Sequence, residues 1–113
     1  MKIKEYIERC HKNAREHGFW DDVPLCDSEK ISEMKHYYNS KLMLIVSELG
    51  EACEALREER FGVQQKDTFE DEIADVFIRL FDLCGGFKID LEKQLERKMK
   101  FNEKRPYKHK KNF

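Results

Sequence analysis

Apolar residues recur every three or four positions along most of the chain, which is the spacing of amphipathic helices. No stretch of useful length alternates apolar and polar residues with a period of two, as a half-buried strand would. We therefore predict an all-α fold of the four-helix-bundle type. The predicted helices run from Lys4 to Glu16, from Glu29 to about Arg60, from Phe69 to about Cys84 and from Leu91 to about Asn102.

Residues that favour helix ends flank these segments. Ser28, Thr68 with Asp71, and Asp90 stand where N-caps are expected. Gly85 and Gly86 are predicted to stop the third helix. Asn39 and Ser40 are expected to bend or divide the second one.

Cys10, Cys53 and Cys84 fall within the apolar patterns and are expected to be small core residues.

The second predicted helix is apolar almost all round between Leu42 and Leu49. Such a surface is typical of the middle of a bundle or of a subunit interface. Within or beside this apolar sequence stand Glu48 and Glu51, and Glu72 and Asp75 form a similar pair in the third helix. A spacing of three places both acids of a pair on one helix face, one turn apart.

Composition limits the classes of protein to which the chain can belong. Its 113 residues suffice for one small domain, which we place at residues 1–105, followed by a basic tail at 106–113. The net charge of −1 gives no overall attraction for nucleic acid, so no nucleic-acid polymer is expected as a partner. We expect no membrane segment or signal peptide, and the four cysteines without a CxxC pair favour a reduced, cytoplasmic protein.

Two acidic pairs among apolar residues are costly to bury unless a proton, a cationic side chain or a metal neutralises them. Mg²⁺ takes hard oxygen ligands and is commonly held by carboxylates together with substrate phosphates. Lys98, Lys100 and Arg105 follow the acids in the sequence and are candidates for binding phosphate. We therefore expect chemistry on a nucleoside triphosphate. The sequence contains no glycine-rich phosphate-binding loop, so the nucleotide would be bound by a different scaffold.

Three segments together resemble the MazG-like branch of the all-α NTP pyrophosphohydrolases, which is akin to the dCTP pyrophosphatases. These segments are SELGEACEALR, FEDEIADVFIRLFDL and KMKFNEKRP, and HGFWDD precedes them. The resemblance implies a four-helix core that assembles as a homodimer or homotetramer. It also implies hydrolysis of a nucleoside triphosphate to the monophosphate and pyrophosphate, with Mg²⁺ or Mn²⁺ as the cofactor. The substrate would be a dNTP or a non-canonical NTP, and the biological role would be the removal of unwanted nucleotides.

The same resemblance assigns roles to individual residues. Glu48, Glu51, Glu72 and Asp75 match the catalytic, metal-binding acids of that family. The residues that it implies for substrate binding are Trp20, as an aromatic that stacks on the base, and Lys98, Asn102 and Arg105, with Phe19 as a further candidate. Apart from the resemblance, His36 is a candidate for a position near a bound nucleotide. The chain departs from the family at Ser47, where many members carry another Glu, and at Arg79, where some carry Tyr.

Several alternatives remain open at this stage. The acidic pairs could instead lie on the surface of a helix and form ion pairs with neighbouring side chains. Phe19 and Trp20 could instead pack a loop against the core. A non-enzymatic helical module that dimerises through Leu42–Leu49 is one rival function. A carboxylate-bridged di-iron protein is another, because Glu8 with His11 and Glu33 with His36 are both ExxH pairs.

Overall fold

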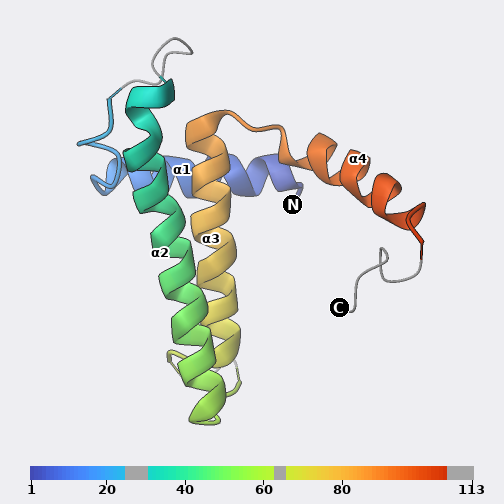
Figure 1. Cartoon of the computed structure of the whole chain (residues 1–113). Helices are drawn as coiled ribbons and strands as arrows, with labels where there is room; N and C mark the ends of the chain where they lie inside the picture. Colours follow the sequence, from blue (N-terminus) through green and yellow to red (C-terminus); the bar gives the residue numbers. More distant parts are fainter. Residues whose placement is uncertain (25–30, 63–65, 107–113) are drawn as a thin grey trace.

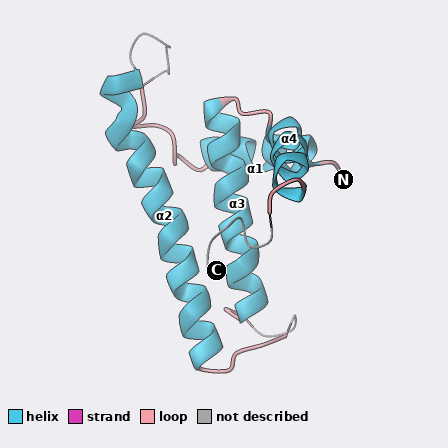
Figure 2. Cartoon of the chain, turned by 45° about the vertical axis from the view of Figure 1, so that its right-hand side comes forward, coloured by secondary structure: helices cyan, strands magenta, loops and turns pink. Residues whose placement is uncertain are grey.

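The computed structural model describes residues 1–24, 31–62 and 66–106 (Figure 1). These residues form helices and contain no strand (Figure 2), so the all-α prediction is confirmed for this part of the chain. None of these helices combines the length and apolarity that crossing a membrane requires. The helices are α1 (Ile3–Glu16), α2 (Ile31–Arg57), α3 (Phe69–Phe87) and α4 (Leu91–Glu103).

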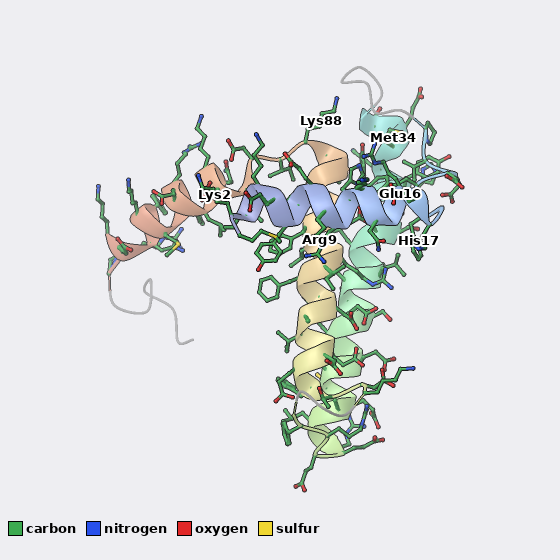
Figure 3. The ribbon with its side chains drawn as sticks, turned by 180° about the vertical axis from the view of Figure 1, so that it is seen from behind. Lys2, Arg9, Glu16, His17, Met34 and Lys88 are labelled. Carbon is green, nitrogen blue, oxygen red and sulfur yellow. The ribbon has the colours of Figure 1, made fainter. Side chains whose placement is uncertain are left out.

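Helices α2 and α3 lie side by side and run in opposite directions (Figure 1). Helix α1 crosses this pair near the end of α3, as the view from behind shows (Figure 3). Ile45 of α2 and Val76 and Leu83 of α3 form a buried cluster within the core, and Leu80 and Phe87 pack against it. The core thus joins the two helices that carry the acidic pairs.

Helix α4 has no buried residue and extends away from α2 and α3 (Figure 1). Its closest partner is α1. Leu95, Met99 and Phe101 of α4 are each at least 40% exposed. In a single chain, the apolar side of α4 therefore has little to pack against.

The predicted stop at Gly85 and Gly86 is wrong, because α3 continues through both residues to Phe87. It ends at Lys88, whose backbone is left-handed, with φ of 59°. The two glycines serve packing. A Cβ on Gly85 would lie 2.5 Å from Cβ of His11, and one on Gly86 would lie 2.2 Å from Cη2 of Trp20. The two glycines, which the sequence suggested as a helix end, instead allow α1 and the loop after it to pack closely against α3.

The remaining boundaries are close to those expected. Helix α2 is continuous through Asn39 and Ser40, so the expected division is wrong, and the predicted start at Glu29 with its Ser28 cap lies outside the described residues. The Thr68 cap of α3 is confirmed, because its side chain accepts from the backbone N–H of Asp71 at 3.2 Å. The Asp90 cap of α4 is likewise confirmed, with Lys93 N–H donating to it at 3.2 Å.

The cysteines differ from one another in burial. Cys84 is buried and Cys10 is half-buried, but Cys53 is exposed, so its expected place in the core is wrong. Cys53 directly follows the buried Ala52 on α2, and one step along a helix turns a side chain by about 100°. It therefore lies on the apolar stripe beside the core stripe.

Candidate functional site

Three of the predicted acids converge between α2 and α3. Glu48 of α2 and Glu72 and Asp75 of α3 each offer a carboxylate oxygen, and these three oxygens lie within 4.8 Å of one another. Glu51 is exposed and does not belong to this group. We call Glu48, Glu72 and Asp75 the acid cluster, and its geometry is compatible with one divalent cation.

Glu72 is the buried member of the acid cluster, with 6% of its surface exposed. It stands in the first turn of α3, where its backbone N–H donates to the carbonyl of Thr68 at 3.0 Å. Burial raises the pKa of Glu72, and the charges of Asp75, Glu48 and Glu51 raise it further. A carboxylate surrounded in this way is stabilised by a proton or by a cation.

Arg79 connects the two helices beside the acid cluster. Its Nε donates to Oε1 of Glu48 at 2.8 Å. Burial, followed by the charge of Glu48, raises the pKa of Asp75, while the Arg79 guanidinium lowers it. Within the described part of the chain, Arg79 is thus the positive charge in contact with the acid cluster, against three carboxyl groups.

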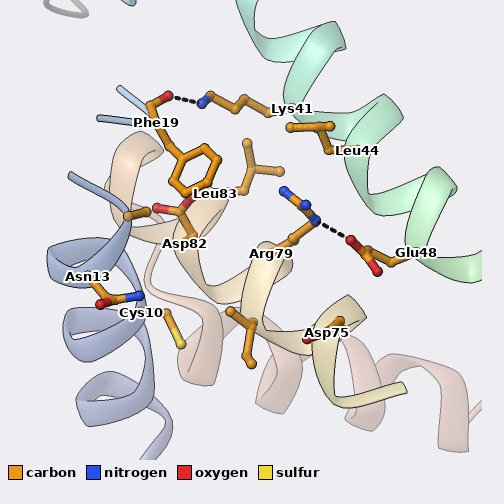
Figure 4. Close-up of a pocket in the computed structure, with 12 residues that line it drawn as sticks. Cys10, Asn13, Phe19, Lys41, Leu44, Glu48, Asp75, Arg79, Asp82 and Leu83 are labelled. Carbon is orange, nitrogen blue, oxygen red and sulfur yellow. Dashed lines mark hydrogen bonds and ion pairs between the residues drawn. The ribbon is translucent and has the colours of Figure 1, made fainter. Parts of the chain in front are cut away.

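A cavity of about 290 Å³ adjoins the acid cluster (Figure 4). Glu48, Asp75 and Arg79 line one side, and Phe19 with Leu83 lies on the opposite side. Binding sites for small molecules usually have this mixture of apolar walls and a few charged groups. The other lining residues are Cys10, Asn13, Ala14, Lys41, Leu44, Ile78 and Asp82.

Trp20 is held by contacts within the protein. Its Nε1–H donates to Oδ1 of Asp82 at 2.8 Å, and Nδ1 of His11 lies 2.9 Å from the same oxygen. The ammonium of Lys41 lies 4.4 Å from the centre of the Trp20 ring, and the ring of His11 meets it edge-on. Trp20 does not line the cavity beside the acid cluster, whereas Phe19 does. The geometry therefore favours Phe19 as the aromatic residue nearest to a ligand there.

The predicted phosphate-binding residues Lys98, Asn102 and Arg105 are exposed on or just after α4. Lys98 and Arg105 both lie over the ring of Phe101, at 5.1 and 4.7 Å from its centre. None of the three lines the cavity beside the acid cluster. In a single chain the structure does not bring them to the acids.

His36 is exposed on α2, and its ring lies 4.0 Å from that of Tyr37. It precedes Glu48 by twelve residues, or about 18 Å along the helix. The structure therefore does not place His36 with the acid cluster.

The sequence left Asp82 open, as either a group that supports the metal ligands or a surface charge, and it did not assign Arg79 to the site, yet both line the cavity. A signal was present, because Glu72, Asp75, Arg79 and Asp82 follow one another at spacings of three, four and three. That spacing marks one face of a helix. Cys10 and Asn13 come from α1, and only the crossing of the helices brings them to the cavity.

Comparisons with protein-family models, with curated proteins and with solved structures found no match. The likeness to MazG-like pyrophosphohydrolases therefore stays a prediction from the sequence segments that carry it. The cluster and its cavity must support a function on their own geometry.

Proposed function

We propose that this protein hydrolyses a nucleoside triphosphate to the monophosphate and pyrophosphate with the help of Mg²⁺. The observation that carries the proposal is the convergence of Glu48, Glu72 and Asp75 beside a cavity with an apolar wall. The substrate would be a dNTP or a non-canonical NTP, and the role would be removal of unwanted nucleotides. The free cysteines Cys10, Cys53 and Cys84 favour a reducing compartment such as the cytoplasm.

The residues of the acid cluster fit a hard divalent cation. All the donor atoms are carboxylate oxygens, which Mg²⁺ and Mn²⁺ both accept. Glu72 is almost fully buried among other acids, so a cation would relieve a repulsion that the protein itself leaves in place. When bound, Mg²⁺ polarises phosphoryl oxygens and lowers the pKa of a bound water.

The lining of the cavity suggests how a bound substrate would be oriented. Its phosphates would lie by the acid cluster, and its base would lie toward Phe19, a residue that is 53% exposed. Lys41, which donates to the backbone carbonyl of Phe19, keeps this loop against α2. Stacking on an aromatic ring tolerates any base, so selectivity would rest on polar lining groups such as Asn13.

The direct test is a panel of canonical and modified NTPs and dNTPs with Mg²⁺ or Mn²⁺, in which pyrophosphate release is measured. We expect release from at least one member. Glu72→Gln should lower the rate by more than about a hundredfold, because it removes a metal ligand. Glu58→Gln, which changes an exposed acid outside the cluster, serves as the matched control. Absence of pyrophosphate from the whole panel would refute the proposal.

The proposal includes a homodimer or homotetramer. Leu42, Val46, Leu49, Cys53 and Leu56 follow one another at spacings of four, three, four and three on α2. All five are exposed, and the four other than Cys53 have exposed fractions between 42% and 53%. This spacing is that of a helix–helix seam, and a monomer would leave the seam in contact with water. A second copy of this chain offers the same seam, so the two can cover each other.

A second copy also gives the residues of α4 a possible role. Since α4 extends away from the acid cluster of its own chain, Lys98, Asn102 and Arg105 would bind phosphate at the site of a neighbouring copy. This arrangement would bring the cationic helix to an acidic site that has one guanidinium of its own.

The oligomer is tested by sedimentation of Leu49→Arg, which we expect to be monomeric because it places a charge in the seam. Ser40→Arg adds the same charge at an exposed position of α2 outside the seam and should leave the assembly unchanged. A wild-type protein that sediments as a monomer at micromolar concentration would contradict this part of the proposal.

A non-enzymatic interaction module is the second candidate, and the exposed seam on α2 is the observation that favours it. Under this reading Glu72→Gln would leave the oligomer intact and pyrophosphate release would be absent from the wild type. The di-iron alternative gains no support. Among the described residues, the group able to hold a metal contains neither Glu8 with His11 nor Glu33 with His36.

A further inference from the structure

Arg79 is bound to the protein through one of its three nitrogens. Its Nε donates to Glu48, and within the described residues no hydrogen bond involves Nη1 or Nη2. Figure 4 shows the end of the guanidinium turned away from Glu48, toward Phe19 and Leu83 across the cavity. The Arg79 side chain is 34% exposed, so a ligand in the cavity can reach it.

The charged groups that line the cavity outside the acid cluster, other than Arg79, already have partners within the protein. Lys41 donates to the carbonyl of Phe19 and lies over the ring of Trp20. Asp82 accepts from Trp20 and contacts His11. Of the two cations that line the cavity, Arg79 is the one that contacts the acid cluster, and its terminal nitrogens are the donors left for a ligand.

We propose that Arg79 is a substrate-binding residue, which holds a phosphate oxygen pair through Nη1 and Nη2 while Nε stays on Glu48. The inference rests on the proposed function and adds to it a residue that the sequence resemblance does not supply. A guanidinium has its donors in a rigid plane, so the bond to Glu48 fixes the direction of the two terminal nitrogens. Two parallel N–H···O bonds to a phosphate are among the strong interactions that arginine makes.

This arrangement ties the cation and the phosphate together. Glu48 belongs to the acid cluster and also orients Arg79, so one side chain sets both positions. Lysine at position 79 would keep the charge but, as a single ammonium, would lose the planar fork.

A purely structural Arg79 is the rival explanation. It would link α2 to α3 and offset the charge of Glu48, but would not touch the substrate. Removing it would then tighten the binding of a divalent cation, because a competing positive charge disappears from the acid cluster. Nucleotide affinity would stay the same or rise with it.

The test measures two affinities by calorimetry, that of Mn²⁺ alone and that of an α,β-imido nucleoside triphosphate with Mg²⁺. The variants are Arg79→Met and Arg79→Lys. Arg57→Met is the control, because Arg57 of α2 pairs with Glu54 at the same 2.8 Å but lies outside the cavity. The analogue replaces the bond that the proposed reaction cleaves, so binding is measured without turnover.

We expect Arg79→Met to weaken binding of the analogue by about tenfold or more, as loss of charged hydrogen bonds does. Its Mn²⁺ affinity should be undiminished, Arg79→Lys should recover only part of the loss, and Arg57→Met should match the wild type. Analogue affinity of Arg79→Met within twofold of the wild type would overturn the inference alone. If Arg79→Met does not fold, Arg79→Lys with wild-type affinity would overturn it. A wild type that binds no analogue of any base would overturn the proposed function as well.

Discussion

Two of the carboxylates on helix α3, those of Asp82 and Glu72, lie in opposite electrostatic surroundings. Asp82 accepts the indole N–H of Trp20 and lies 2.9 Å from Nδ1 of His11, so other side chains satisfy it. Glu72 is more deeply buried, and its charged neighbours are the acids Glu48 and Asp75. A buried acid with donors holds a fold together, whereas a buried acid among acids favours a cation from outside.

The comparison is tested most strongly by neutralising each acid in turn. Asp82→Ala should lower the free energy of unfolding by about 2 kcal/mol, because Trp20 and His11 lose their acceptor. Glu72→Gln should unfold at a higher temperature than the wild type when no divalent cation is present, because it removes a repulsion. Urea and thermal unfolding at neutral pH measure both effects. Equal destabilisation by the two changes would remove the distinction between them.

The contact around Asp82 can also be disturbed through Gly86, which lies one turn further along α3 and also packs against Trp20. Gly86→Ala should destabilise the protein by about 1–3 kcal/mol, because its methyl group would lie 2.2 Å from Trp20. Gly50→Ala is the matched control in α2, where nothing lies within 4 Å of the added carbon. It should stabilise the helix by about 0.5–1 kcal/mol. Destabilisation by both changes would show that the packing against Trp20 is not the cause.

The smallest effect is the dependence on pH. The pKa of Glu72 is raised above its ordinary value of 4.5, so the folded state keeps this proton to a higher pH than the unfolded state does. The resulting stabilisation is complete below 4.5 and is lost as pH rises through the raised pKa. Without metal, the advantage of Glu72→Gln over the wild type should therefore grow by a few degrees as pH rises.

Thermal unfolding in EDTA from pH 4 to pH 8 measures this difference. Adding Mg²⁺ at the upper end should reverse it, because the wild type gains stability from binding that the variant lacks. A difference that does not change with pH would mean that Glu72 titrates as an ordinary carboxyl group.

Much of the helical fold could be predicted from the sequence because its signals are local. Periodicity placed the helices, and the Thr68 and Asp90 caps were read correctly from single residues. Gly85 and Gly86 misled because the reason for them lies in α1 and the following loop, far away in sequence. Local spacing cannot show which other segment packs against a helix face.

The candidate site could be predicted only in part. The spacing of three placed Glu72 and Asp75 on one face of α3, and the antiparallel packing of α2 and α3 joined Glu48 to them, but Glu51 of the other pair is exposed and lies outside the acid cluster. Which aromatic faces the cavity depends on the path of one loop, and Phe19, next to the predicted Trp20, holds that place. The position of α4 relative to the acids also depends on tertiary packing, which the sequence of α4 does not encode by itself.

Thr68 has no exposed surface, and its cap holds the first turn of α3, which contains Glu72. Any opening of that turn would carry Glu72 away from Glu48, so the open form would lose cation affinity. By mass action, the free energy of closing the turn is then part of the free energy of cation binding. A bound cation would slow hydrogen exchange at the amides of Asp71 and Glu72. The exchange rates of these two amides would therefore measure occupancy of the site without an assay of catalysis.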